Sequence, residues 1–189
     1  TALRLAPQLA EAWRVKGLIA RVISLRTGDR SIYAEALQSF RRAVELDPDD
    51  SDALAMLASQ ALSDDRQEEG IALLRRALQI DPLSRLAQQL LGAALAAQGK
   101  YAESEQQYAS LISLYPNFTS AKVLLGELLI EQGRLDEAAR LLNDPQLIRE
   151  DPLAGILMAN IYANLGMTEQ FRRVLADVRT PPAAAEMAH

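Results

Sequence analysis

The chain has no cysteine and only one histidine, His189, which is its last residue. Without cysteine it can form neither disulfides nor thiolate metal sites. Because the histidine ends a tail that we expect to be disordered, the sequence predicts neither a histidine-based triad nor a histidine metal site. The glycines are isolated, and no phosphate-binding or dinucleotide-binding fingerprint is present. These absences argue against an enzyme and against a bound cofactor or metal.

Aromatic residues make up only 5% of the 189 residues, and leucine and alanine dominate the 49% that are hydrophobic. Leucine and alanine favour helices, so the composition predicts an all-helical chain. The net charge is -5, and the basic residues are dispersed among acidic ones. This pattern lacks the basic face that a nucleic-acid-binding protein needs. No apolar run approaches the roughly 20 residues that span a bilayer. The sequence assigns no compartment.

Residues 85–118 set a pattern that neighbouring stretches repeat at a spacing of 34 residues. The pattern includes Leu91, Gly92, Gly99, Tyr108 and Pro116. Its counterparts on the two sides are Leu57, Ala58, Gly70, Leu74, Ala77 and Pro82, and then Leu125, Gly126, Gly133, Ala138 and Leu142. A period in the thirties is typical of stacked helical repeats.

These residues resemble the tetratricopeptide repeat family. The stretches 10–48 and 85–116 look like clear members, and the likeness covers about residues 2–179. The resemblance implies an all-α fold, a right-handed α-solenoid of about five helix-turn-helix units. It also implies that the first helix of each unit lines a concave groove for a protein or peptide partner.

The repeat spacing predicts how the chain divides. Residues 1–9 are expected to end a preceding repeat, because Ala2, Leu5 and Pro7 have the spacing of the residues that close later units. An irregular natural N-terminus is the alternative. The expected units are 10–50 with extended helices, 51–84, 85–118, 119–150 with a truncated second helix, and a degenerate C-terminal unit 151–179, followed by a disordered tail 180–189.

Two units depart from the regular pattern. The first is seven residues longer than its neighbours, so we expect its first helix to end near Arg26, with Gly28 as the break. The fourth has Pro145 where the pattern has Leu111. Because proline disrupts a helix interior, the second helix there should stop by Asp144, and residues 146–150 should form a linker.

Small residues recur where paired helices should approach closely. Gly17 and Gly126 on first helices are expected to face Ala36 and Ala138 on the helices that follow. Small side chains in both places allow helix axes to approach to about 8–10 Å.

The face of each first helix that is not used in stacking should line the groove. These residues are Arg14, Leu18, Arg21, Ala55, Ser59, Leu62, Gln89, Ala93, Ala96, Val123, Glu127, Ile130, Ile156 and Asn160. The middle of this set is small and apolar, with basic groups toward its start and an acidic group toward its end. An amphipathic helix or a short apolar peptide fits such a surface. The alternative is that some of these side chains simply pack between helices.

A known use of the family, clamping the acidic tail of heat-shock chaperones, fits poorly. Arg14 can stand for one cation of that clamp, but Leu18, Ser59, Gln89 and Ala93 occupy places where it needs asparagine, lysine or arginine. Paired carboxylates such as those at 49–50 and 64–65 lie at turns, where they cap helices.

Two function hypotheses remain. The first is a non-catalytic scaffold that binds a peptide or helix in its groove. The second is a sensory or self-assembly segment of a multidomain bacterial regulator, because an extended first unit followed by regular ones resembles the C-terminal arrays of winged-helix regulators and adenylate cyclases. In the second case the N-terminal repeat end is the expected self-association surface.

Overall fold

The computed structural model describes residues 8–179, and every regular element in that range is an α-helix. The prediction of an all-α solenoid of helix-turn-helix units is therefore confirmed. Two expectations, the repeat end before residue 8 and the tail after residue 179, lie outside the described residues. The chain divides into two compact units between Lys100 and Tyr101. No helix in the described range has the length and hydropathy needed to cross a membrane.

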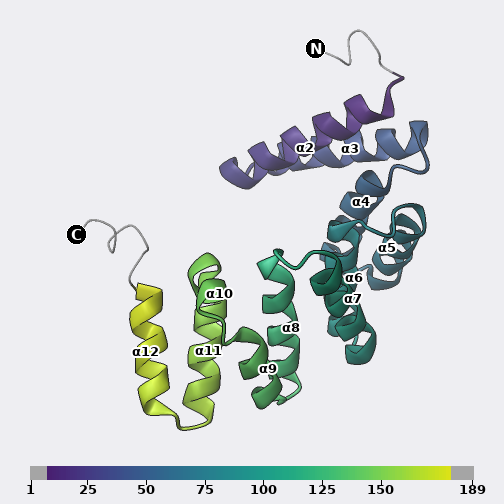
Figure 1. Ribbon diagram of the computed structural model, residues 1–189. Coiled ribbons are helices and arrows are strands. Elements are labelled where there is room, and N and C mark those ends of the chain that lie inside the picture. Colours follow the sequence, from purple (N-terminus) through teal and green to yellow (C-terminus); the bar gives the residue numbers. More distant parts are fainter. Residues whose placement is uncertain (1–7, 180–189) are drawn as a thin grey trace. The chain divides into compact units, whose positions relative to one another are not determined.

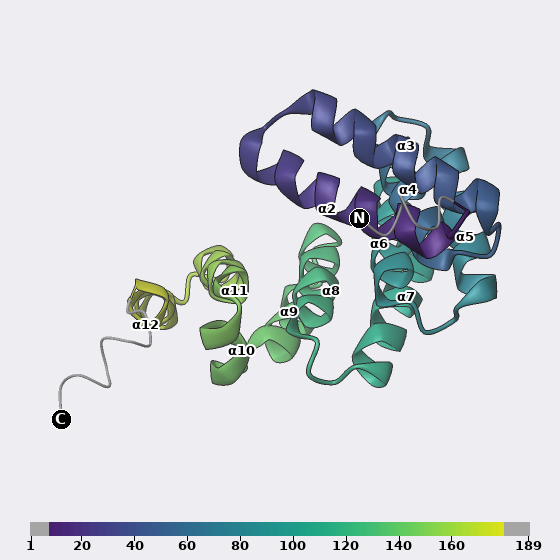
Figure 2. The same cartoon turned by 90° about the horizontal axis from the view of Figure 1, so that it is seen from above.

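The first unit consists of helical pairs joined by short turns (Figure 1). Its helices are α2 (Ala10–Thr27), α3 (Arg30–Leu46), α4 (Ser51–Ser63), α5 (Gln67–Ile80) and α6 (Arg85–Ala97). Helix α2 packs against α3, and α4 packs against α5; the α2 and α3 pair is also seen from above in Figure 2. With 18 and 17 residues, α2 and α3 are longer than the 13-residue α4.

The second unit continues the alternation with one extra short helix (Figure 1). Its helices are α7 (Tyr101–Leu114), α8 (Thr119–Glu131), α9 (Leu135–Leu142), α10 (Pro145–Glu150), α11 (Pro152–Asn164) and α12 (Thr168–Arg179). Helix α8 packs against α9, and α11 packs against α12 and α10.

The inter-helix turns use the left-handed backbone conformation. Gly28 follows α2 with φ 71°, and the turns after α6, α8 and α11 have glycines with φ between 70° and 73°. The turn after α4 places Asp65 in the same conformation, with φ 61°. A side chain makes this conformation costly, which explains why glycine recurs there.

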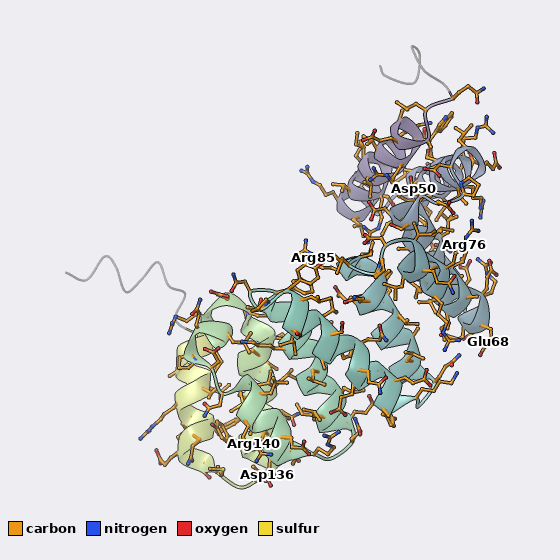
Figure 3. The ribbon with its side chains drawn as sticks, turned by 45° about the vertical axis from the view of Figure 1, so that its right-hand side comes forward. Asp50, Glu68, Arg76, Arg85, Asp136 and Arg140 are labelled. Atoms are coloured by element: carbon orange, nitrogen blue, oxygen red, sulfur yellow. The ribbon has the colours of Figure 1, made fainter. Side chains whose placement is uncertain are left out.

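Several helices begin at a side chain that caps a free backbone N–H group. The Asp50 carboxylate, labelled where α4 begins in Figure 3, accepts a hydrogen bond of 2.9 Å from the Ala53 backbone nitrogen. Asp151 caps α11 by accepting from the Leu153 nitrogen at 3.1 Å. At these helix starts a carboxylate has a structural role.

The expected linker after Asp144 is wrong, because these residues form helix α10. Helix α9 does end before Pro145, at Leu142. Pro145 then serves as the first residue of α10, where its missing N–H group costs nothing. Asp144 caps this helix by accepting hydrogen bonds from the nitrogens of Gln146, at 2.9 Å, and Leu147, at 3.3 Å. The same proline therefore ends one helix and begins another.

Large side chains of the following helices lie nearest to Gly17 and Gly126. A Cβ atom added to Gly17 would lie 2.7 Å from Phe40 Cε1, and one added to Gly126 would lie 2.6 Å from Leu142 Cδ1. Phe40 and Leu142 each lie one turn beyond the alanine that we expected in that place. The glycine thus makes room for a buried ring or leucine of the partner helix.

Each unit has its own apolar core. In the first unit one cluster gathers around Leu54, Leu74 and Leu95, and another around Phe40. In the second unit Leu142, Leu147 and Met158 lie in a cluster on which Phe171 and Leu175 of α12 pack. Helix α12 leaves Arg172 and Arg173 exposed. Its outer face is therefore polar at these two positions.

Candidate interaction surfaces

Arg14, the first predicted groove residue, connects α2 to the start of α4. Its Nε lies 3.2 Å from an Asp50 oxygen and its Nη1 lies 3.0 Å from an Asp52 oxygen. Glu11 lies 4.0 Å from Nη2. Three carboxylates thus surround one guanidinium, so Arg14 is not an unpaired cation available to an acidic peptide tail.

The other predicted residues of the first unit divide between the core and the surface. Ala55 is 0% exposed and belongs to the core rather than to a surface. Leu18 packs on the Phe40 cluster and Leu62 packs against Gly70. Arg21, Ser59, Gln89 and Ala96 are half-buried, and Ala93 is exposed.

In the second unit the predicted residues divide between core and surface. Val123 is 2% exposed and packs in the core cluster. Glu127 and Ile130 of α8 are half-buried, whereas Ile156 and Asn160 of α11 are exposed. Ile156 leaves 55% of its surface in solvent. Because α8 and α11 are in contact, both contribute to the surface of this unit.

Glu127 is the electrostatically unusual member of this set. Its carboxylate has no hydrogen bond or ion pair within the described part of the chain. Burial raises the pKa of Glu127, and the negative charge of Asp151 raises it further. Burial also raises the pKa of Tyr108 to about 12, with a smaller contribution from Glu127. Tyr108 is therefore neutral near pH 7, while Glu127 is a carboxylate that a cation would stabilise.

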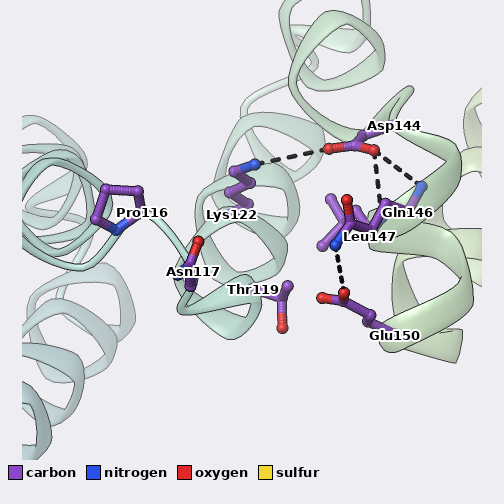
Figure 4. A pocket seen from close by; sticks show the side chains of 8 residues that line it. All are labelled: Pro116, Asn117, Thr119, Lys122, Asp144, Gln146, Leu147 and Glu150. Atoms are coloured by element: carbon purple, nitrogen blue, oxygen red, sulfur yellow. Dashed lines mark hydrogen bonds and ion pairs between the residues drawn. The ribbon is translucent and has the colours of Figure 1, made fainter.

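A pocket of about 420 Å³ lies where the loop before α8 meets the start of α10 (Figure 4). Lys122 Nζ lies 3.7 Å from Asp144, and Gln146 donates a hydrogen bond of 2.7 Å to Glu150. The pocket is lined by Pro116, Asn117, Thr119, Lys122, Asp144, Gln146, Leu147 and Glu150. Its main charged and amide groups already pair with one another, so they hold α10 in place rather than converge on a ligand.

No group of three or more histidine, cysteine, aspartate or glutamate side chains within residues 8–179 is placed to hold a metal ion. Sequence reasoning missed the pocket, because α10 was expected to be a linker. It named the N-terminal repeat end as a self-association surface but not the residues of the outer face of α2, where Val15, Ile19 and Val22 are exposed. A signal for that face was present, since β-branched residues recur there at helical spacing.

Family models described as tetratricopeptide repeat match residues 28–85 and residues 95–154. Together these matches cover more than half of the chain. A comparison with curated protein sequences gives no match.

Solved structures with a similar fold include PilW, PilF and YrrB. PilW, described as a widely conserved type IV pilus biogenesis factor, is 22% identical with a TM-score of 0.77, over 94% of this chain and 80% of PilW. PilF of Pseudomonas aeruginosa is 22% identical with a TM-score of 0.76, over 89% of this chain and 74% of PilF. YrrB, described as a repeat protein with an unusual peptide-binding site, is 19% identical with a TM-score of 0.63, over 94% of this chain and 88% of YrrB. At these identities the likeness shows the fold alone.

Proposed function

Because this chain belongs to the tetratricopeptide repeat family, whose members are generally non-catalytic scaffolds, we propose that it binds a peptide or an amphipathic helix. The occupant lies on the exposed faces of the first helices of the repeats. The description of YrrB, a protein of similar fold, with a peptide-binding site supports this class of occupant.

Two observations on the contacting helices α8 and α11 carry the proposal, the partial burial of Glu127 and the exposure of Ile156. Glu127 is partly desolvated and has no cationic partner within the described residues, which costs free energy in the unbound chain. Ile156 on the neighbouring helix α11 is 55% exposed, and Ile130 on α8 is half-buried. A partner that supplies a cation and an apolar side chain would satisfy both groups.

The partner should supply a cation for Glu127 and an apolar side chain for the exposed Ile156. An amphipathic helix presents apolar side chains at a spacing of three or four residues, with charged side chains beside them. Lysine or arginine at the edge of such a face is attracted to Glu127, and the net charge of -5 favours the approach of a basic partner. We therefore expect a basic, amphipathic segment as the occupant.

The proposal includes neither a catalytic step nor direct contact with nucleic acid. Two of the arginines, Arg134 and Arg66, are paired with carboxylates of the chain itself. Arg134 lies 2.7 Å from Glu105 and 2.8 Å from Glu137, and Arg66 lies 2.6 Å from Glu69. Breaking these pairs would offset the gain from a phosphate contact.

A displayed library of random peptides, panned against the 189-residue chain, tests this function. We expect enriched peptides to combine leucine, isoleucine or phenylalanine with lysine or arginine. Ile156→Asp should abolish capture, and Glu127→Lys should weaken it at least about tenfold, a loss typical of a charge pair at an interface.

Leu83→Asp is the matched control, because Leu83 is 57% exposed but lies between α5 and α6 in the other unit. This variant should capture the same peptides as the unmodified chain. Failure to enrich any peptide, or peptides whose binding ignores both Ile156→Asp and Glu127→Lys, would contradict the proposal.

A further inference from the structure

Helix α2 exposes more large apolar side chains than any other helix of the described residues. Of the twelve exposed large hydrophobic side chains among the described residues, five belong to α2. They are Val15, Ile19, Val22, Ile23 and Leu25. At 100° per residue, Val15, Ile19 and Val22 form a stripe on the side opposite the buried residues Gly17, Ala20 and Ser24. We call these three residues the α2 stripe.

The corresponding face of α4 in the next repeat is covered by a neighbouring helix. Val15 and Ala12 precede Met56 and Ala53 of α4 by 41 residues, the length of the enlarged first unit. Met56 is 5% exposed, because α3 packs on it together with Ala53. Val15, by contrast, is 44% exposed, and no helix within residues 8–179 covers it. The α2 stripe therefore includes a position that bears a neighbouring helix in the following unit.

The opposite end of the repeats differs in chemistry. Helix α12 turns Phe171 and Val174 toward the core and exposes Arg172 and Arg173. The outer face of α12 is therefore charged at these positions. It gives the α2 stripe no apolar counterpart, which disfavours a head-to-tail contact between copies. A contact of α2 with itself closes after two copies and leaves both α12 faces free.

The sequence of α2 suits an antiparallel contact with a second α2. The helix spans residues 10–27, and a two-fold axis through its centre places Glu11 opposite Arg26 and Val15 opposite Val22. Ile19 then meets Ile19 of the other copy. Glu11 and Arg26 are both exposed, so each end of the apolar stripe gains a pair of opposite charges. A parallel contact would place like charges together at both ends.

We propose that the α2 stripe is a homodimer interface in which two α2 helices pair antiparallel across a two-fold axis. This contact is independent of the peptide-binding surface of α8 and α11. The interface is isologous, so each substitution in α2 acts twice in the dimer.

Light scattering and sedimentation of the 189-residue chain over a range of concentrations test the dimer. We expect a reversible monomer–dimer equilibrium. Ile19→Asp should raise the dimer dissociation constant by about 100-fold or more, because it removes a buried isoleucine from each copy. Ile156→Asp is the matched control, since Ile156 and Ile19 are 55% and 56% exposed. That variant should leave the dimer unchanged, and circular dichroism should show that both variants keep their helices.

The absence of cysteine makes the register testable by cross-linking. A chain with Ile19→Cys should form a disulfide-linked dimer on oxidation. Chains with Val15→Cys and with Val22→Cys should link preferentially to each other when mixed. Glu11→Arg or Arg26→Glu alone should weaken the dimer, and the two together should restore it, because the pair is only reversed.

Three results would overturn the proposal. One is a strict monomer at all concentrations, including a monomer whose α2 binds a different helix. Another is a dimer that Ile19→Asp leaves intact. The third is efficient self-linking by Val15→Cys without linking to Val22→Cys, which indicates a parallel contact. An unmodified chain that dimerises but captures no peptide would instead count against the proposed function alone.

Discussion

Asp65 occupies a backbone conformation that glycine occupies in the other left-handed turns between helices. Its φ of 61° is the only positive value found for a non-glycine residue in the described range. For an L-residue this conformation costs roughly 1–2 kcal/mol, and somewhat less for aspartate. Glycine removes that cost but has more freedom to lose on folding. Asp65→Gly should therefore stabilise the chain by about 0.5–1 kcal/mol, measured as the urea midpoint of the helical signal.

Gly99→Asp is the reverse experiment, because Gly99 has φ 72° and nothing lies within 4 Å of an added Cβ. It should destabilise the chain by a similar amount. Equal stability of both variants and the unmodified chain would show that these turns relax without strain.

The effect of Glu127 on the stability of the chain should depend on pH. Its pKa in the folded chain is raised above the ordinary value of 4.5 by burial and by Asp151. Below the unfolded pKa the protonated group costs nothing, and the cost appears as pH rises through the folded pKa. Glu127→Gln should therefore raise the thermal midpoint at pH 7 but leave it unchanged below pH 4. A gain that is the same at both pH values would show that ionisation is not its cause.

At the scale of elements, α10 depends on Asp144 and Pro145 acting together. Hydrogen bonds from the backbone of Gln146 and Leu147 lower the pKa of Asp144, with a further contribution from Lys122. A lowered pKa means that this stabilisation is present above the ordinary value of 3.8 and is lost as pH falls through the folded pKa. Asp144→Ala should lower the thermal midpoint at pH 7, and the difference should shrink as pH falls through the folded pKa. A constant difference would point to lost packing of the side chain instead.

Helix ends were largely predictable from local chemistry, whereas burial of single residues was not. Gly28 and Pro145 mark helix ends because they act through their own backbone. The prediction failed after Pro145 because it treated proline only as a terminator and overlooked the Asp-Pro start of α10. Ala55 and Val123 were assigned to the groove from helical periodicity alone. Their burial depends on how closely the next helix approaches, which the repeat spacing does not specify.

At the scale of the molecule, the repeat period predicted the fold class because each helical pair needs only its neighbours to bury its apolar face. The same locality explains why the candidate surfaces were harder to predict. Glu127 and Ile156 come from different repeats. Glu11 and Arg26 form a charge pair only in the proposed dimer, where each faces the other residue of the second copy. The repeat pattern in the sequence predicts which side of a helix each residue occupies, but it does not predict which residues of other helices or chains contact it.

Because each helical pair packs mainly on its neighbours, we also expect the two units to respond separately to destabilising substitutions. Met158 is fully buried in the core of the second unit. Met158→Ala should cost about 2–5 kcal/mol, because it removes apolar contacts and leaves a cavity. In a chain stabilised by contacts between neighbouring repeats, the loss of stability should be greatest in the helices that pack around Met158. Hydrogen exchange should therefore accelerate in α8, α9, α11 and α12, while amides of α4 and α5 keep their protection.

Leu74→Ala, at an equally buried position of the first unit, should give the converse pattern. Equal acceleration throughout the chain in both variants would show instead that the repeats unfold as one cooperative unit.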